Sequence, residues 1–281
     1  MQVKEQYRWI HVDKKFIALG LVVVASGCMH TSSQITPPAQ GPGSSGQGLQ
    51  ISTFDISDKA LSPGQQGLIT LSLENYQDQS IQIDDISLYN TGVLEVEKQG
   101  CTPSSSEIDG AREDYIPTVE CSWRITAPEE EFENFDSKTI PVKLNLAYNS
   151  YISNSKQPVK IHFKPLDEIE QTNNVEESFS NGEVQMDIST ESPVQFEGAP
   201  VTITVRGAGN GRVDSNYTFE YFPEDVFASC PSEKEPLVEQ EAEFSCSIDP
   251  QAENSQTRNL VISTSYKYVK APTLDVEVVN R

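Results

Sequence analysis

Five cysteines are the residues of this chain whose type and spacing suggest defined chemistry. Four of them form two close pairs: nineteen residues separate Cys101 from Cys121, and fifteen separate Cys230 from Cys246. In an exported protein, pairs of this kind are typical of disulfides. Zinc is the competing ligand, but the chain has no C-x-x-C motif, and His162 is the one histidine in the part expected to fold. The spacing therefore favours two disulfides, and no metal site is expected.

The fifth cysteine, Cys28, lies at the end of an export pattern. A basic segment precedes the apolar stretch 16–24, and the small residues Ala25, Ser26 and Gly27 follow it. These are the marks of a secretory signal. A cysteine directly after such small residues resembles a lipobox, in which the cysteine is acylated and becomes the first residue of the mature chain. The sequence therefore predicts a signal peptide at 1–27 and lipidation of Cys28.

Two other interpretations of this leader stay open: an uncleaved N-terminal anchor, and an ordinary secretory signal in which Cys28 has no role. The apolar stretch is shorter than the roughly 20 residues that span a bilayer. The predicted partner is therefore membrane lipid, reached through acylated Cys28, and stable retention needs two acyl chains. Residues 28–48 are rich in Ser, Thr, Pro, Gly and Gln and are expected to form a disordered tether. The expected location is the extracellular face of the cell membrane.

The charge of the chain argues against several partners. It carries 20 basic and 42 acidic side chains, a net charge of −22, and the predicted leader holds more basic than acidic residues. Such a surface repels phosphate backbones, so nucleic acid is not an expected partner. Acidic residues spread along the chain fit solubility in high salt, where repulsion is screened. Dedicated calcium sites are the alternative, although no D-x-D-x-D-G loop is present.

No motif in the chain marks a catalytic or cofactor site. His162 alternates with apolar neighbours and is expected to face solvent on a strand, and no G-x-S-x-G partner exists for it. The glycine-rich run 207–211 lacks the helix and lysine of a phosphate loop and is expected to be a hairpin turn. No cofactor and no enzymatic activity are predicted. Asn216 begins the one N-x-S/T sequence and is a candidate glycosylation site.

Alternating apolar residues predict an all-β protein. Ile69, Leu71 and Leu73 alternate with polar residues, and residues 142–148 do the same. Short strands separated by turns over about 115 residues favour a β-sandwich at 49–165. The polar, acidic segment 166–181 is expected to be an interdomain linker with at most a short helical turn.

Residues 182–281 repeat the plan of 49–165 and predict a second sandwich. A Pro and a Gly precede an alternating strand in both halves, and a cysteine pair precedes the penultimate strands. The strand at 260–266 matches the one at 142–148, and 274–278 matches 159–163. Tyrosines recur at equivalent places and are expected to pack within strands (Tyr148, Tyr151, Tyr266 and Tyr268). The predicted architecture is two tandem sandwiches of one fold.

Several short motifs of the chain resemble those of a known group of surface domains. The phrase Ser62-Pro-Gly, an alternating strand and Glu74-Asn75 is similar to immunoglobulin-like surface domains of archaea, related to CARDB adhesion-type and S-layer-associated modules. Residues 123–128, 141–148 and 205–211 are similar to later strands and turns of such domains in small archaeal lipoproteins. The resemblance implies Ig-like domains, a cell-surface position and an archaeal origin. It implies no shared catalytic residue.

Together these observations favour a non-enzymatic, membrane-anchored surface lipoprotein that presents two Ig-like antiparallel β-sandwiches to its envelope partners. The expected partner is an S-layer protein, another envelope protein or a glycan. A ligand- or glycan-binding envelope protein is the alternative, and a ligand module of that kind needs a large apolar pocket with convergent polar groups. A secreted hydrolase is the third candidate, and the shortage of histidine argues against it.

Overall fold

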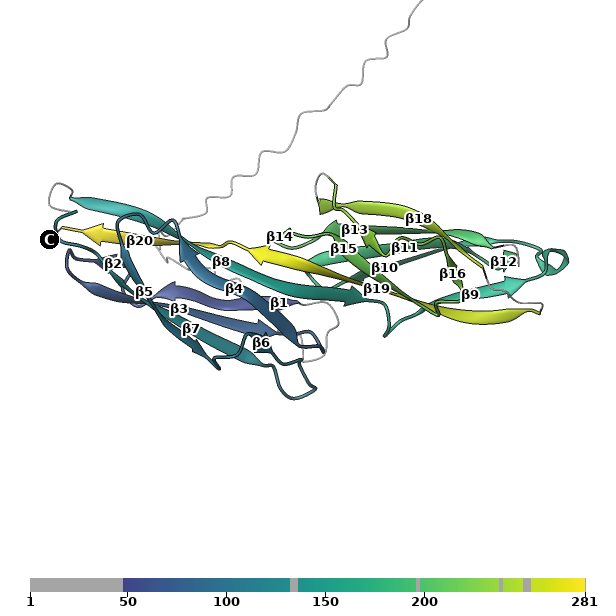
Figure 1. The fold of residues 1–281 in the computed structure, drawn as a ribbon, viewed down its shortest axis with the longest axis horizontal. Coiled ribbons are helices and arrows are strands. Elements are labelled where there is room, and N and C mark those ends of the chain that lie inside the picture. Colours follow the sequence, from purple (N-terminus) through teal and green to yellow (C-terminus); the bar gives the residue numbers. More distant parts are fainter. Residues whose placement is uncertain (1–47, 132–135, 196–197, 238–239, 250–253, 281) are drawn as a thin grey trace, which may run out of the picture. The chain divides into compact units, whose positions relative to one another are not determined.

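The strands of the computed structural model form two β-sandwiches (Figure 1). The structure describes residues 48–131, 136–195, 198–237, 240–249 and 254–280. The predicted signal peptide, Cys28 and nearly all of the predicted tether lie outside them. The predicted all-β sandwich fold is confirmed, and one short 3-10 turn, η1, is the helical element within the described ranges.

Sandwich 1 packs the sheet β1-β3-β7-β5 against the strands β4-β8-β20-β2. Buried and exposed residues alternate along β3, so that Ile69, Leu71 and Leu73 face the core as predicted. The strands are β1 (Leu49–Ile56), β2 (Ala60–Leu61), β3 (Gln66–Asn75), β4 (Ile81–Tyr89), β5 (Glu95–Thr102), β6 (Glu107–Ile108), β7 (Thr118–Thr126), β8 (Ser137–Ser153) and β20 (Thr273–Val279).

Sandwich 2 repeats this arrangement, with the sheet β10-β11-β13-β18-β16 against β15-β19-β9-β12. Its strands are β9 (Val159–Lys164), β10 (Asn173–Ser180), β11 (Val184–Ser192), β12 (Val194–Gln195), β13 (Ala199–Gly207), β14 (Arg212–Val213), β15 (Tyr217–Phe222), β16 (Phe227–Ala228), β17 (Glu233–Lys234), β18 (Ala242–Ile248) and β19 (Gln256–Lys270). β12 runs parallel to β9, as β2 runs parallel to β20.

The two sandwiches exchange their last strands, which differs from the expected division of the chain. β9 was expected in sandwich 1, but it pairs with residues 256–260 of β19 in sandwich 2. β20 was expected in sandwich 2, but it pairs with residues 137–143 of β8 in sandwich 1. Figure 1 shows yellow β20 beside the blue strands of sandwich 1 and teal β9 beside the green strands of sandwich 2. Alternation predicts a strand but carries no information on its neighbour, which is why the assignment differs.

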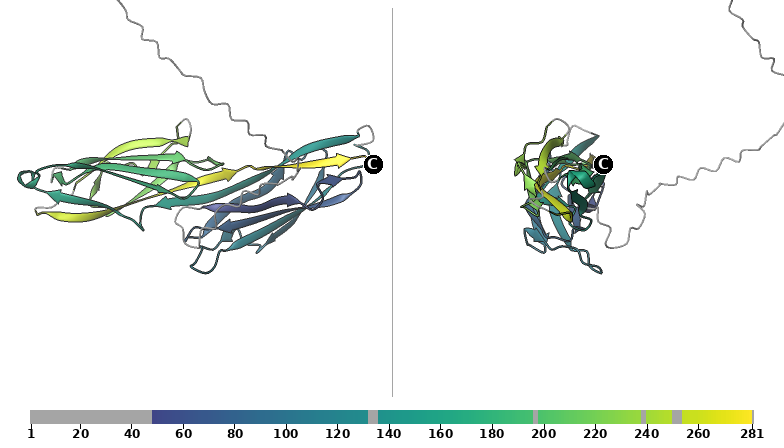
Figure 2. Two further views of the ribbon diagram at one scale, coloured as in Figure 1. Left: turned by 180° about the vertical axis from the view of Figure 1, so that it is seen from behind. Right: turned by 90° about the vertical axis from the view of Figure 1, so that its right-hand side faces the viewer.

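Two long strands belong to both sandwiches. Residues 146–153 of β8 pair with residues 263–270 of β19, after β8 has already paired with β4 and β20. The left view of Figure 2 shows the yellow strand running beside the teal one from behind. One continuous sheet therefore passes through both sandwiches, in the order β12-β9-β19-β8-β20-β2.

The expected linker at 166–181 is mostly structured. It contains η1 (Leu166–Glu168) and then β10, which pairs with β11 over its whole length at the edge of the sandwich 2 sheet. The short helical turn agrees with the prediction. Because β9 already lies in sandwich 2, this segment connects two strands of the same sandwich. The polar composition of β10 reflects an exposed edge, where one neighbouring strand is enough.

Both predicted disulfides are present, between Cys101 and Cys121 and between Cys230 and Cys246. In sandwich 1 the two cysteines are direct register partners on β5 and β7. In sandwich 2 the bridge ties β18 to the residue that follows β16 by two positions. Each bridge therefore joins neighbours at the same edge of the repeated sheet.

Replacing Cys101 and Cys121 together by serine is expected to lower the free energy of unfolding by about 3 kcal/mol. The bridge closes a loop of about 20 residues, and closing such a loop restricts the unfolded chain. Urea unfolding of the oxidised wild type and of the double variant measures the difference. The Cys230–Cys246 bridge stays intact in both proteins, and equal midpoints for wild type and variant would contradict a stabilising role.

Candidate functional site

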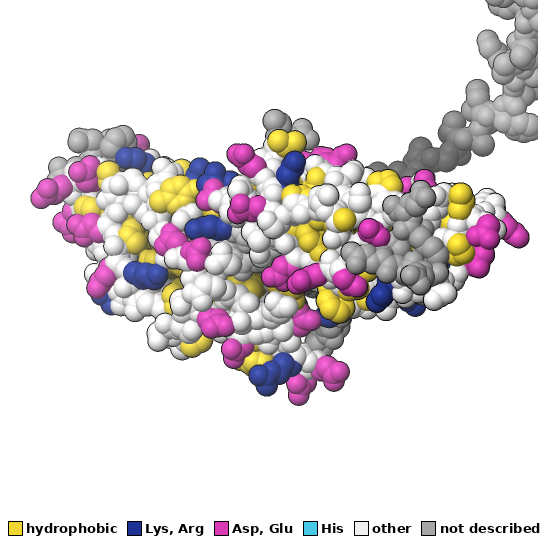
Figure 3. Space-filling view, turned by 45° about the vertical axis from the view of Figure 1, so that its right-hand side comes forward, with side chains coloured by type: hydrophobic (Ala, Val, Ile, Leu, Met, Phe, Trp, Pro, Cys, Tyr) yellow, Lys and Arg dark blue, Asp and Glu magenta, His cyan; other side chains and the backbone are white. Residues whose placement is uncertain are grey.

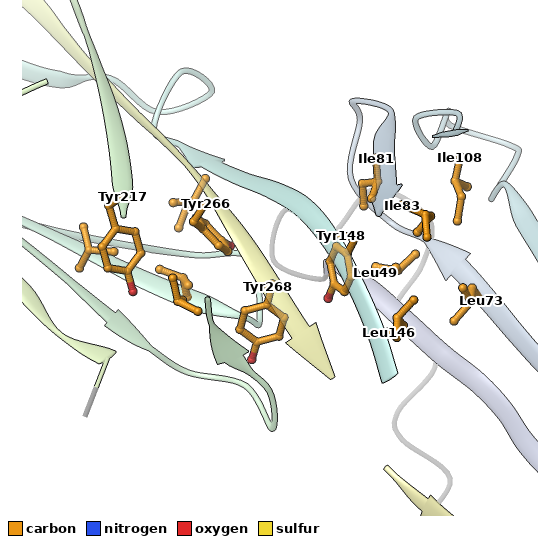
Figure 4. Packing of buried hydrophobic residues seen from close by; sticks show 14 of the residues in the cluster. Leu49, Leu73, Ile81, Ile83, Ile108, Leu146, Tyr148, Tyr217, Tyr266 and Tyr268 are labelled. Carbon is orange, nitrogen blue, oxygen red and sulfur yellow. The ribbon is translucent and has the colours of Figure 1, made fainter. Parts of the chain in front are cut away.

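The most densely connected polar group in the described structure is Glu183, at the joint between the sandwiches. Its side chain is 1% exposed, and it precedes β11. Figure 4 shows Tyr148 from β8 with Leu49 from the start of β1 beside it, and Tyr266 and Tyr268 on the neighbouring strand β19. We call Leu49, Tyr148, Ser150, Glu183, Tyr266 and Lys270 the joint cluster.

The carboxylate of Glu183 accepts hydrogen bonds from both sandwiches. The Tyr148 hydroxyl donates to Oε1 at 2.5 Å and the Ser150 hydroxyl to Oε2 at 2.6 Å. The Leu49 backbone N–H donates to Oε1 at 3.0 Å, and the Tyr266 hydroxyl reaches Oε2 at 3.4 Å. Hydrogen bonds to an ionised acceptor are about twice as strong as neutral ones. Glu183 therefore ties β1, β8 and β19 to the start of β11.

Lys270 supplies the counter-charge. Its ammonium lies 3.7 Å from Glu183 Oε1, its side chain is 15% exposed, and it donates to the Leu49 carbonyl. It also lies 5.7 Å from the ring centre of Tyr148 and 5.9 Å from that of Tyr268, within the range of cation–π contacts. Burial lowers the pKa of Lys270, and the charge of Glu183 opposes that shift. Burial also raises the pKa of Tyr148 well above its usual value, with the negative charge of Glu183 adding to the effect.

A local turn aims Glu183 inward. The side-chain oxygen of Asn181 accepts the backbone N–H groups of Glu183 and Val184 at 3.1 and 2.9 Å, the geometry of an Asx turn. Gly182 adopts φ +80°, which favours glycine. Gly48 is also required, because a Cβ there would lie 2.2 Å from Glu183 Oε1. The backbone before β1 therefore passes directly over the buried carboxylate.

A pocket of about 190 Å³ opens beside the joint cluster. Its walls come from the turn after β3, the end of β8 with the turn that follows, and the end of β10. We call it the joint pocket. It is lined by Tyr76, Gln77, Asp78, Tyr151, Ile152, Ser153, Asn154, Ser155, Lys156, Gln157, Ser178, Phe179, Ser180 and Asn181.

Three side chains form a polar triad at this pocket. The Tyr151 hydroxyl donates to Asp78 Oδ1 at 2.5 Å, and the Lys156 ammonium lies 3.0 Å from Asp78 Oδ2. The Tyr151 hydrogen bond, and secondarily Lys156, hold the pKa of Asp78 below its usual value, although partial burial opposes them. Burial and the Asp78 carboxylate raise the pKa of Tyr151. Asp78 is therefore an ionised acceptor, and Tyr151 is a neutral phenol.

The amide of Gln77 links the pocket to the joint cluster in one orientation. Ser150 donates its hydroxyl hydrogen to Glu183, which as a carboxylate only accepts, so Ser150 must accept from Gln77. The Gln77 NH₂ group therefore faces Ser150 at 2.9 Å, and its carbonyl oxygen points elsewhere, buried and without a hydrogen-bond partner. A side chain that lines the pocket is thus held in place by the same network that holds the sandwiches together.

A second hollow, of about 650 Å³, lies on sandwich 2. Tyr221, Phe222 and Phe227 contribute rings to it, and Phe222 is 66% exposed. The rings of Tyr221 and Phe227 lie 5.0 Å apart.

On the face drawn in Figure 3, acidic side chains are interspersed with basic ones and with small apolar patches. This agrees with the spread of acidic residues along the sequence.

The remaining predicted site residues lie apart from the joint. Asn216 is exposed directly before β15, a position open to modification, and its glycosylation stays a prediction. His162 faces solvent on β9, as predicted, with its ring nitrogen 2.8 Å from the Thr257 hydroxyl. The glycine-rich run 207–211 connects β13 to β14, but these strands do not pair with each other: β13 pairs with β11 and β18, and β14 pairs with β19. The predicted hairpin turn is therefore wrong, because the run carries the chain from one sheet of sandwich 2 to the other. In the described ranges no three His, Cys, Asp or Glu side chains are grouped to hold a metal ion. Those ranges likewise hold no helix that is long and apolar enough to cross a membrane.

Sequence reasoning missed Glu183, Lys270 and Asp78. Each is one charge among 62 acidic and basic side chains, and none belongs to a recognisable motif. The recurring tyrosines were the available signal, because Tyr148, Tyr266 and Tyr268 are buried as expected. Their hydroxyls required a buried polar partner, and that partner is the carboxylate of Glu183 for the first two.

Comparisons with known proteins do not assign the chain to a family. No family model matches it, and neither does any curated protein. Among solved structures it is similar to the secreted serine protease VesC from Vibrio cholerae, with 8% identity and a TM-score of 0.26 over 81% of this chain and 51% of that one. It is also similar to the collagen adhesin CNA from S. aureus, with 9% identity and a TM-score of 0.19 over 82% and 92%. The chain spans about half the length of VesC. Both TM-scores are too low for these likenesses to carry an argument about function.

Proposed function

We propose that this protein is a non-enzymatic lipoprotein, anchored through acylated Cys28 on the outer face of the cell membrane. Its two sandwiches would act as one interaction module for a partner in the envelope, such as an S-layer protein. The observation that carries the proposal is the sharing of β8 and β19 by both sandwiches. A module that works by presentation needs its binding loops held in a constant arrangement.

The joint supplies that constancy. Eight register pairs connect β8 to β19 between the parts of these strands that belong to each sandwich. Glu183 adds hydrogen bonds to β1 and β8 that would be costly to break, because its carboxylate is buried. A flexible linker between two independent domains would allow the loops to move separately, whereas two continuous strands oppose bending at the joint.

The order of the strands supports an Ig-like fold as part of this proposal. Ig domains place strands A, B, E and D on one sheet and C, F and G on the other. In sandwich 1 the orders β1-β3-β7-β5 and β4-β8-β20 follow this scheme, with β20 in the place of strand G. The disulfides depart from the antibody pattern, because each joins neighbours in one sheet and not two facing sheets.

Replacing Cys28 by serine is expected to move the protein from the membrane fraction to the soluble exported fraction. Without acyl chains the described part offers no membrane-spanning helix to hold it. Fractionation of cells that express wild type or Cys28→Ser, followed by immunoblotting, measures the shift. His30→Ser is the matched control. Retention of Cys28→Ser in the membrane would contradict the anchor.

The interaction role has its own test. Wild-type cells are treated with a cross-linker, the protein is purified, and covalently linked proteins and glycans are identified by mass spectrometry. Recovery of one defined envelope component, at levels that fall in cells that express Cys28→Ser, is the expected result. Recovery of membrane lipid alone would contradict a role in presentation.

A further inference from the structure

We propose that the joint pocket binds one uncharged sugar residue, such as the terminal residue of an envelope glycan. This inference deepens the proposed function, since it rests on a surface position and names the chemistry of one ligand. The pocket is defined by the lining given above. Its volume, its charge balance and its mixture of apolar and hydrogen-bonding groups point to the same class of ligand.

The size of the pocket limits the ligand to a single small unit. Its volume of about 190 Å³ is below the roughly 300–1,000 Å³ of pockets that enclose drug-sized molecules. A polymer therefore cannot enter, but one ring at the end of a chain can, with the rest of the glycan remaining in solvent.

The charges at the pocket favour a neutral ligand. Asp78 and Lys156 are its acidic and basic lining residues, and they pair with each other at 3.0 Å. A ligand carboxylate or ammonium would have to displace one member of this pair to find a counter-ion. An uncharged hydroxyl can instead bond to both, because Asp78 retains acceptor capacity and Lys156 retains N–H donors.

The remaining lining suits a ring that carries hydroxyl groups on an apolar frame. The lining combines two aromatic residues, Tyr76 and Phe179, with several serines. Apolar and aromatic walls with a few fixed polar groups are typical of small-molecule sites. Sugars combine C–H surfaces with alternating donors and acceptors, and this wall offers partners for both.

Two asparagines hold the pocket in its shape before any ligand arrives. Asn154 donates to the Leu260 carbonyl at 3.0 Å and accepts from the Ile262 N–H at 2.7 Å. Asn181 donates to the Tyr151 carbonyl at 2.9 Å, which fixes the backbone behind the Tyr151 side chain. A site that is already ordered loses less conformational entropy on binding.

The test is saturation-transfer NMR of the full-length chain in detergent micelles, with methyl glycosides of glucose, galactose, mannose and N-acetylglucosamine as probes. We expect at least one of them to bind with a Kd on the order of 1 mM, because a ligand with so few atoms makes few contacts. Asp78→Ala and Tyr151→Phe should each weaken binding by about tenfold, because each removes a hydrogen-bonding group of the triad.

Asp84→Asn is the matched control. Asp84 pairs with Lys267 at 2.9 Å, as Asp78 pairs with Lys156, but it lies outside the joint pocket. Its substitution should leave sugar binding unchanged. Lys156→Ala is a further variant whose 60% exposed side chain can be removed without disturbing the core. The proposal is overturned if none of the four glycosides binds, or if binding is the same in wild type and in all three pocket variants.

This outcome is separable from that of the proposed function. Membrane retention through Cys28 and cross-linking to an envelope component do not depend on the joint pocket. Loss of sugar binding alone therefore removes the glycan inference, while failure of the Cys28→Ser and cross-linking experiments removes the surface role.

Discussion

Replacing Glu183 by glutamine is expected to lower the free energy of unfolding by about 3–5 kcal/mol, the typical cost of removing one partner from a buried ion pair. The substitution removes the counter-charge of the Lys270 ammonium, whose side chain is 15% exposed. It also puts an NH₂ group where one of two carboxylate oxygens now accepts the hydroxyls of Tyr148 and Ser150. Urea unfolding, followed by far-ultraviolet circular dichroism, measures the change.

Two further variants separate the ion pair from general disturbance. Asp84→Asn breaks an ion pair with Lys267 that is far more exposed, and it should cost much less than Glu183→Gln. Combining Glu183→Gln with Lys270→Met should recover part of the loss, because an uncharged pair needs no counter-ion. A loss below about 1 kcal/mol for Glu183→Gln alone would show that the joint does not depend on this carboxylate.

Truncation of the chain after Lys270 is expected to destabilise sandwich 1, although most of that sandwich lies more than 100 residues earlier in sequence. The truncation removes β20, whose Val276 and Val278 are buried in the core of sandwich 1. Burial of each such side chain contributes about 1.5–3 kcal/mol. Residues 137–143 of β8 also lose the backbone partners that β20 supplies.

Hydrogen exchange read by mass spectrometry locates the effect. Amides of residues 137–143 and of β2 should lose protection in the truncated chain, while those of β9 and β12 should keep it. Ile161→Asp is the matched control. Ile161 is fully buried on β9, so its substitution should lower the amide protection of sandwich 2 before that of sandwich 1. Loss of protection confined to β11 and β13 in the truncated chain would instead support the division predicted from sequence, in which β20 belongs to sandwich 2.

These two expectations concern the features that sequence reasoning did not reach. Alternation at Ile69, Leu71 and Leu73 predicted a strand with one buried face, and the structure agrees, because side-chain period is a local property of extended backbone. The same alternation occurs at 159–163 and 274–278, where it predicted strands and misplaced them. The pairing of strands depends on contacts between distant segments, and a strand with this alternation can add to the sheet of either sandwich.

The cysteines and the pocket show the same contrast. Cys101 with Cys121 and Cys230 with Cys246 were predictable from short spacing, because nearby cysteines meet easily across adjacent strands. Asp78, Tyr151 and Lys156 meet at the joint pocket although more than 70 residues separate the first from the other two. No local pattern distinguishes such residues from the many other charges on an acidic chain.

The sequence by itself therefore determined an all-β sandwich fold, a repeated plan and two disulfides, because period, composition and short spacing act locally along the chain. Only the tertiary structure decided that β9 and β20 change places, that β8 and β19 belong to both sandwiches, and that Glu183 is buried between them. These features arise from packing, in which a buried carboxylate must find its donors and its counter-charge wherever the fold brings them.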